Sequence, residues 1–221
     1  MKKQILILII ILSFGFSKVE NLFTAQYPDK IKYKGIEYSL NTNPLEPYFE
    51  KNPKKRPKAS STALWRGYIG HFEIINDQLF LTDITQPLYY TDSEGKRRTK
   101  NISYYKRIFP KKEKVKIEWY NGILILPFGE RIKYVHSGYA SEYSNYILLE
   151  IKKGNLKKDK NYIHKQFLSF KKRQFSEFKK TTEFKTEFEN IKKNFPEWNK
   201  KDIETFLKNY IINYTTEFLT E

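Results

Sequence analysis

The spacing of apolar and polar positions changes once along the chain, and the change divides the sequence into two parts. Between residues 30 and 153, short segments rich in Ile, Leu, Val and Tyr alternate with turn residues, a pattern typical of β-strands joined by hairpins. Asn121-Gly122 is the clearest turn, because both residues tolerate the positive φ of a type I′ turn. Further turns are expected at Lys34-Gly35, Asn76-Asp77 and Gly129-Glu130. Strands are therefore predicted at 31–33, 36–38, 63–75, 79–84, 115–120, 123–127, 132–136 and 146–151.

Successive hairpins of this kind form an antiparallel β-meander, which we expect to be either an open sheet or a small barrel. Polar, basic loops at 51–58 and 92–100 interrupt the strands, the first of them containing two prolines. We assign residues 27–155 to this antiparallel β domain.

The spacing becomes helical after Asn161. Apolar residues then recur mostly every three or four positions, with Lys and Glu on the opposite side, as in an amphipathic helix. Pro196 ends this helix, and Asn199 caps a second one whose apolar stripe runs over 203–218. We therefore predict an α+β fold in which the meander is followed by a C-terminal antiparallel helix pair over residues 158–221. The apolar positions of the first helix are Phe167, Phe170, Phe175, Phe178, Phe184, Phe188 and Ile191.

Residues 1–17 have the pattern of a secretory signal. Lys2 and Lys3 precede an almost unbroken apolar run at 5–16. This run is shorter than the roughly 20 residues that span a hydrocarbon core. We therefore predict a Sec-type signal peptide cleaved after Ser17, and an extracytoplasmic protein that is periplasmic or secreted. The alternatives are a retained N-terminal anchor and a buried core segment. No later stretch approaches spanning length.

The formal charge of +16 would by itself favour a polyanionic partner. Only seven of the 41 basic residues are arginine, however, and arginine is the usual reader of phosphates and base edges because of its planar fork. We therefore favour a solvated lysine surface, and export further disfavours nucleic acid. Polysaccharide or anionic lipid of the cell envelope remains a candidate partner. The absence of cysteine excludes disulfides, thiolate nucleophiles and a lipidated N-terminus.

The segment 64–73 concentrates residues that are unusual in a strand. If it is a strand, Trp65, Gly67 and Phe72 cannot share one face unless a bulge lies near Gly70. Two glycines in one strand also indicate a sharp bend or the close approach of another backbone. The segment is therefore expected to lie at a corner of the sheet.

Two interpretations of that corner are open. In the functional one, Arg66, Tyr68 and His71 line a concave site at the bend. In the structural one, Trp65 and Phe72 pack in the core while Arg66 stacks over an aromatic ring. We favour the structural interpretation, because glycines and lone aromatic residues in strands usually serve packing.

The segment 134–143 is the second candidate. Its small residues predict a loop, and its polar side chains include a histidine able to titrate near neutrality. A binding site combines such a tight backbone with convergent polar groups. Ser137, Ser141 and Glu142 lie close to His136 in sequence, but the Gly-x-Ser-x-Gly elbow of many hydrolases is absent. The polar side chains are Tyr134, His136, Tyr139, Glu142 and Tyr143.

Motifs for metals and nucleotides are missing from the sequence. The three histidines, at 71, 136 and 164, show no metal-ligand spacing, and there is no calcium loop or phosphate-binding glycine loop. A carboxylate pair for glycoside hydrolysis would have to combine Glu73 with Glu118 or Glu142, and nothing else supports it. We therefore expect neither a metal nor a cofactor.

Three functions fit these observations. The first is a binding protein whose β domain carries an aromatic-lined site for a protein or a glycan. The second is a hydrolase that uses His136 or Glu142 as general base and Arg66 as an electrostatic clamp. The third is an envelope-associated protein whose basic helix, 161–195, lies on an anionic membrane. The ligand-binding candidates are Trp65, Arg66, Tyr68, His71, Trp119, Tyr134, His136, Tyr139 and Tyr143.

Overall fold

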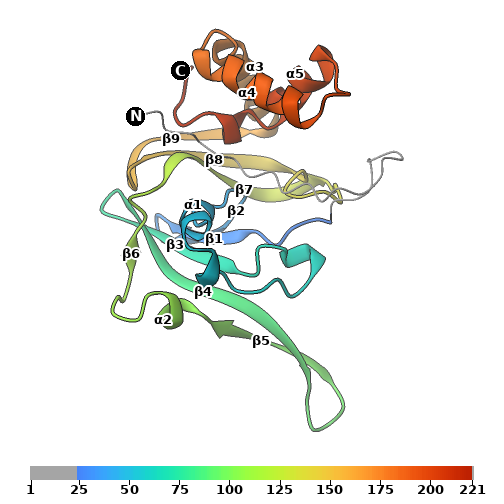
Figure 1. Ribbon diagram of the computed structural model, residues 1–221. Helices are drawn as coiled ribbons and strands as arrows, with labels where there is room; N and C mark the ends of the chain where they lie inside the picture. The colour runs from blue at the N-terminus through green and yellow to red at the C-terminus, as the bar shows by residue number, and fades with distance from the viewer. Residues whose placement is uncertain (1–23, 221) are drawn as a thin grey trace.

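The computed structural model describes residues 24–220, so the predicted signal segment, 1–17, lies outside the described residues. The chain folds into a mostly antiparallel open sheet of nine strands, followed by three main helices, which confirms the α+β class (Figure 1). The strands are β1 (Asp29–Tyr33), β2 (Ile36–Leu40), β3 (Ile69–Ile75), β4 (Gln78–Thr91), β5 (Arg97–Ser103), β6 (Val115–Lys116), β7 (Asn121–Lys133), β8 (Glu142–Lys152) and β9 (Asn155–Ile163). The helices are α1 (Glu46–Lys51), α2 (Tyr105–Ile108), α3 (His164–Phe178), α4 (Thr182–Asn194) and α5 (Lys200–Asn209).

The strand order differs from a simple meander. It runs β2-β1-β3-β4-β9-β8-β7, and β5 and β6 both pair with β4. β1 pairs with β3 in parallel. This is feasible because the long connection that contains α1 leads the chain from the end of β2 back to the start of β3. The meander prediction is therefore wrong at β1–β3, and again where β4 pairs with the late strand β9.

Two predicted hairpins are confirmed. Lys34-Gly35 joins β1 to β2, and Asn76-Asp77 joins β3 to β4, with positive φ at all four residues. The turn Lys153-Gly154 also has positive φ at both positions and joins β8 to β9. Strand β9 was not predicted, because most of its residues are Lys, Asp or Asn and carry little apolar signal.

The Asn121-Gly122 hairpin prediction is wrong. Asn121 begins β7, and its side chain accepts a hydrogen bond from the backbone N of Lys153 at 2.9 Å. The preceding residues instead pair with β4, where the N of Ile117 donates to the O of Leu79 at 2.9 Å. Tertiary pairing therefore overrides the local turn preference of the Asn-Gly pair.

Gly129 also departs from its predicted role as a turn. It has a φ of +78° and lies where the register of β7 against β8 shifts between Phe128 and Arg131. A glycine with positive φ permits such a bulge without breaking the strand. β7 and β8 therefore form one long ribbon.

β8 separates two hydrophobic cores. Ile147 and Leu149 contribute to the core that β1–β4 share with β7, whereas Tyr146 and Leu148 contribute to the core under the helices. Because alternate residues of a strand face opposite sides, the unbroken apolar run of β8 reflects burial on both faces. Figure 1 shows α3, α4 and α5 covering β8 and β9 on the side away from β1–β4.

The predicted helix pair is in fact three helices. The long helix expected over 161–195 breaks after Phe178, and Thr181 caps α4 by accepting a hydrogen bond from the N of Phe184 at 3.2 Å. An internal cap of this type favours a new helix start over continuation. The apolar face of α3 is buried against the sheet. Within residues 24–220, none of the helices combines the length and apolar character needed to cross a membrane.

The start of α5 provides a test of local stability. The side chain of Asn199 accepts hydrogen bonds from the N of Lys201 at 2.8 Å and of Asp202 at 3.1 Å. The variant Asn199→Ala should lose about 1 kcal/mol of unfolding free energy, measured by urea denaturation. The control Asn194→Ala changes an exposed residue in the last turn of α4 and should stay within about 0.5 kcal/mol of the parent. Equal losses in both variants would contradict the capping role.

Candidate functional site

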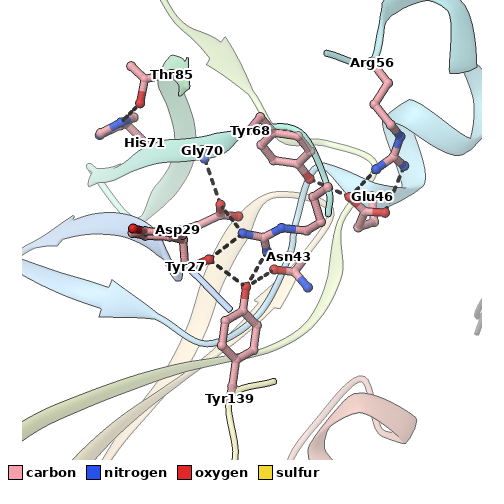
Figure 2. A network of polar contacts seen from close by, with 11 residues as sticks. Tyr27, Asp29, Asn43, Glu46, Arg56, Tyr68, Gly70, His71, Thr85 and Tyr139 are labelled. Carbon is pink, nitrogen blue, oxygen red and sulfur yellow. Dashed lines mark hydrogen bonds and ion pairs between the residues drawn. The ribbon is translucent and has the colours of Figure 1, made fainter. Parts of the chain in front are cut away.

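A buried ion pair lies at the centre of the candidate site. Arg66 precedes β3 and is 1% exposed, and Asp29 begins β1 and is 0% exposed. One guanidinium nitrogen of Arg66 lies 3.2 Å from Oδ1 of Asp29, and the N of Gly70 donates to the same oxygen at 2.8 Å. Figure 2 shows these groups converging from β1 and β3.

Arg66 also joins two further segments to this pair. It donates to the backbone O of Tyr27 at 2.8 Å and to Oη of Tyr139, which lies in the loop between β7 and β8. Oη of Tyr139 donates in turn to Oδ1 of Asn43 at 2.9 Å. The guanidinium carbon lies 5.3 Å from the ring centre of Tyr68 and 5.7 Å from that of Tyr139, within cation–π range.

A second ion pair lies beside the first. Oη of Tyr68 donates to Glu46 of α1 at 2.7 Å, and Arg56 donates to both oxygens of that carboxylate at 2.9 Å each (Figure 2). Two parallel hydrogen bonds fix the orientation of the carboxylate. Tyr68 therefore lies between the two arginine–carboxylate pairs.

Burial dominates the electrostatics of the cluster. It raises the pKa of Asp29 to about 6, although the charge of Arg66 and the hydrogen bond from Gly70 act to lower it. For Arg66, burial is the largest influence and acts to lower the pKa, but Asp29, Tyr139 and Tyr68 together outweigh it, so the pKa lies above its ordinary value. Burial also raises the pKa of Tyr68 and of Tyr139.

The network is closed to solvent. Asp29, Arg66 and Tyr68 are each at most 1% exposed, so a substrate has no path to them in this structure. Within residues 24–220, Oδ2 of Asp29 and Nε of Arg66 are buried without a hydrogen-bond partner, a costly arrangement. The geometry supports a clamp that holds β1, β3, α1 and the β7–β8 loop together.

The structure brings three of the predicted site residues together. Arg66, Tyr68 and Tyr139, from the two segments singled out by sequence, meet in the buried network. Phe72 is buried, as the structural interpretation expects, whereas Trp65 is 45% exposed rather than in the core. The stacking of Arg66 on an aromatic ring is observed.

The glycines of this segment also act as predicted. A Cβ on Gly67 would lie 2.1 Å from the backbone O of Pro57, so another backbone does approach closely. The bulge expected near Gly70 falls between His71 and Phe72. The segment over 65–68 is a loop and not the start of a strand, since β3 begins at Ile69.

The other candidates have partners elsewhere. Nδ1 of His136 lies 2.7 Å from Oη of Tyr134, and Glu142 pairs with His164 at 2.8 Å. Nε2 of His71 lies 2.8 Å from Oγ1 of Thr85, and burial lowers the pKa of His71.

Trp119 and Tyr143 serve packing. Nε1 of Trp119 donates to the O of Pro44 at 2.9 Å, and its ring lies 5.2 Å from that of Tyr48. Tyr143 packs against the core beneath the helices. Both side chains thus contribute to the stability of the fold.

Sequence reasoning missed the side chains that accept hydrogen bonds in the network. Asp29, Asn43 and Glu46 lie outside the two segments that were singled out, and none belongs to a motif. The one available signal is that Asp29 is the only acid between Glu20 and Glu37 in a stretch rich in lysine. Its partner, Arg66, is 37 residues away, so the pairing could not be inferred from spacing.

An exposed β-ribbon is the other distinctive feature. The outer part of β4 pairs only with β5 and projects from the side of the molecule opposite α3, α4 and α5 (Figure 1). All seven residues of β5 are exposed. We call residues 86–103 the arm. Residues opposite each other in an antiparallel pair share a face, so one face of the arm, here the arm face, carries Leu88, Tyr90, Arg98, Lys100 and Ile102.

The described residues thus offer two features of different kinds, a closed charged network and an exposed arm. Within residues 24–220, no group of three or more His, Asp and Glu side chains is placed to hold a metal ion. Comparison with protein-family models, with curated proteins and with solved structures gives no match.

Proposed function

We propose that this chain is an extracytoplasmic binding protein whose arm face contacts a protein partner. The observation that carries the proposal is the set of large apolar side chains left exposed on one face of a projecting ribbon. Leu88, Tyr90 and Ile102 are 40%, 44% and 37% exposed. A two-stranded ribbon is at best marginally stable alone, and these apolar side chains are not buried against any other part of the described chain. Contact with a partner would bury them.

The composition of the arm face supports a protein interface. Tyrosine and arginine are enriched among residues that dominate binding energy, and both occur here, as Tyr90 and Arg98. Nζ of Lys100 lies 5.5 Å from the ring centre of Tyr90, so the aromatic ring is held beside a cation. Arg98 pairs with Asp92 at 2.7 Å at the tip of the arm.

The shape of the arm favours a protein over a small glycan. Small ligands are usually enclosed in concave sites that bury most of their surface. The arm is a projecting ribbon (Figure 1), whereas two grooves within residues 24–220 lie along α3. The charged residues of β5, by contrast, disfavour uncontrolled pairing of its free edge with other strands. A partner that packs on the face, rather than along the edge, fits this pattern.

The buried network has a supporting role in this proposal. Arg66 holds the backbone of Tyr27, whose Oη lies 3.2 Å from that of Tyr89 at the arm. The side chain of Gln86 donates to the O of Lys58 and of Gly67 at 2.7 Å each. The base of the arm is therefore fixed to the loop that contains Arg66, and the arm is presented in one orientation.

The hydrolase alternative receives no such support. His136, Glu142 and Arg66 are each bound to other side chains within the described residues, and Arg66 is 1% exposed. The predicted base and clamp therefore do not form one site. The envelope alternative, with the apolar face of the 161–195 helix in a membrane, would require α3 to leave its buried position against the sheet.

A photo-crosslinking experiment tests the arm. A photoreactive amino acid replaces Tyr90 in the protein produced in its native host, and a control places it at Tyr210 on the far side, where the tyrosine is 42% exposed. We expect a discrete protein adduct from the arm position that the control position does not give. Absence of an adduct, or the same adducts from both positions, would overturn the proposal.

The affinity for that partner should then depend on Tyr90. Tyr90→Ala should weaken binding by about 2 kcal/mol, or roughly 30-fold, because truncating an aromatic anchor removes most of its contact. Tyr210→Ala should leave the affinity unchanged. Both side chains are substantially exposed, so thermal unfolding should be nearly unaltered in both variants. Biolayer interferometry with the purified partner measures the difference.

A further inference from the structure

A basic groove lies between α3 and α5, away from the arm. Its volume is about 560 Å³. The side chains that pack α3 and α5 into the core, such as Phe178 and Ile203, lie on the faces turned away from solvent. The groove is therefore bordered by the outer edges of both helices. Its lining residues are Lys172, Phe175, Ser176, Lys179, Lys200, Lys201, Glu204, Thr205 and Lys208.

Positive charge dominates this lining. It contains five lysines against one glutamate, an excess of four positive charges. Glu204 lies 3.6 Å from Nζ of Lys179 and 4.0 Å from Nζ of Lys200, so two lysines share one carboxylate. Within residues 24–220, Lys172, Lys201 and Lys208 have no ion-pair partner.

Holding these ammonium groups around one groove costs energy because like charges repel. Beside the lining residue Lys172, the pKa of Lys171 is lowered by burial, while the charge of Glu142 acts to raise it and that of Lys208 to lower it. An anion in the groove would remove this repulsion. The first-turn N–H groups of α5 contribute little, because Asn199 already accepts hydrogen bonds from the N of Lys201 and of Asp202.

We propose that the groove between α3 and α5 binds a ligand that carries clustered phosphate groups. Lysine ammonium groups bind phosphate as point charges, and several of them around one groove match several phosphate charges. The hydroxyls of Ser176 and Thr205 add donors within the same lining. The ligand has two sources, a soluble oligophosphate or the phosphate headgroups of an anionic lipid surface.

The test uses the full chain and two probes at low ionic strength. Sodium tripolyphosphate is titrated by isothermal calorimetry, and co-sedimentation measures binding to phosphatidylglycerol/phosphatidylcholine vesicles against vesicles of phosphatidylcholine alone. The groove variant is Lys200→Gln/Lys201→Gln. The matched control is Lys111→Gln/Lys112→Gln, which removes the same charge from exposed residues in the α2–β6 connection.

We expect the groove variant to bind the phosphate probe about tenfold more weakly than the parent, because each exposed charge contact contributes up to about 1 kcal/mol. The control should change binding less than twofold. Binding of tripolyphosphate without vesicle binding identifies a soluble ligand, and vesicle binding that requires phosphatidylglycerol identifies a lipid surface. The proposal is overturned if the parent binds neither probe, or if the control weakens binding as much as the groove variant.

Discussion

Replacing Arg66 with methionine should lower the free energy of unfolding by about 4 kcal/mol. The substitution keeps much of the side-chain volume but leaves the Asp29 carboxylate buried without its cation, and breaking a buried pair from one side costs about 3–5 kcal/mol. It also removes the hydrogen bonds to Tyr27 and Tyr139. This loss is a large part of the 5–15 kcal/mol typical of a folded domain. Urea denaturation at pH 8, where Asp29 is ionised in the parent, measures it.

The double variant Arg66→Met/Asp29→Asn isolates the charge. Asparagine keeps an oxygen that can accept from the N of Gly70 and removes the unpaired charge, so we expect the double variant to regain about 2 kcal/mol relative to Arg66→Met. Arg98→Met is the matched control, because Arg98 pairs with Asp92 at 2.7 Å with its side chain 53% exposed. It should lose less than about 1 kcal/mol. The clamp would be contradicted if Arg66→Met lost as little stability as Arg98→Met. It would also be contradicted if the double variant showed no recovery relative to Arg66→Met.

The sequence predicts the elements of this fold better than their arrangement. The turns at Lys34-Gly35 and Asn76-Asp77 join strands that are neighbours in sequence and in the sheet, so local preference and tertiary pairing agree there. At Asn121-Gly122 they disagree, and the pairing of β7 with β8 prevails. Local patterns contain no information about which distant strand offers a better partner, so the β1–β3 and β4–β9 pairings were not predictable.

The candidate site shows the same division. Arg66, Tyr68 and Tyr139 were singled out because a charged or polar residue in a glycine-rich segment is unusual, and the three side chains do meet. Their acidic partner Asp29 sits in an ordinary strand start, and its burial follows only from the packing of β1 beside β3. The exposure of the arm likewise depends on β5 having a partner on only one side.

The stability of the protein should fall as the pH rises from 4 to 7, through the titration of Asp29. Its pKa is about 6 in the folded chain and 3.8 ordinarily, so between these values the folded state binds more protons than the unfolded state. Stability therefore decreases with rising pH across this window, by about 2 kcal/mol, and becomes level by about pH 7. His71 acts in the opposite direction, because its pKa is lowered on folding.

Subtracting the unfolding free energy of Asp29→Asn from that of the parent cancels the contribution of His71 and of every other group that the two proteins share. We expect the unfolding free energy of the parent minus that of the variant to fall by about 2 kcal/mol between pH 4 and pH 7, as measured by urea denaturation at several pH values. The control Asp92→Asn should give a level difference over the same range, because its hydrogen bond to Arg98 lowers the pKa of Asp92 and places its window below pH 3.8.

A level difference for Asp29→Asn would mean that water reaches Asp29, and the closed network would then be wrong. A fall of the expected size would instead show that burial costs this carboxylate more than Arg66 returns, so that the pair serves to hold β1, β3 and the arm in one arrangement rather than to add stability at neutral pH.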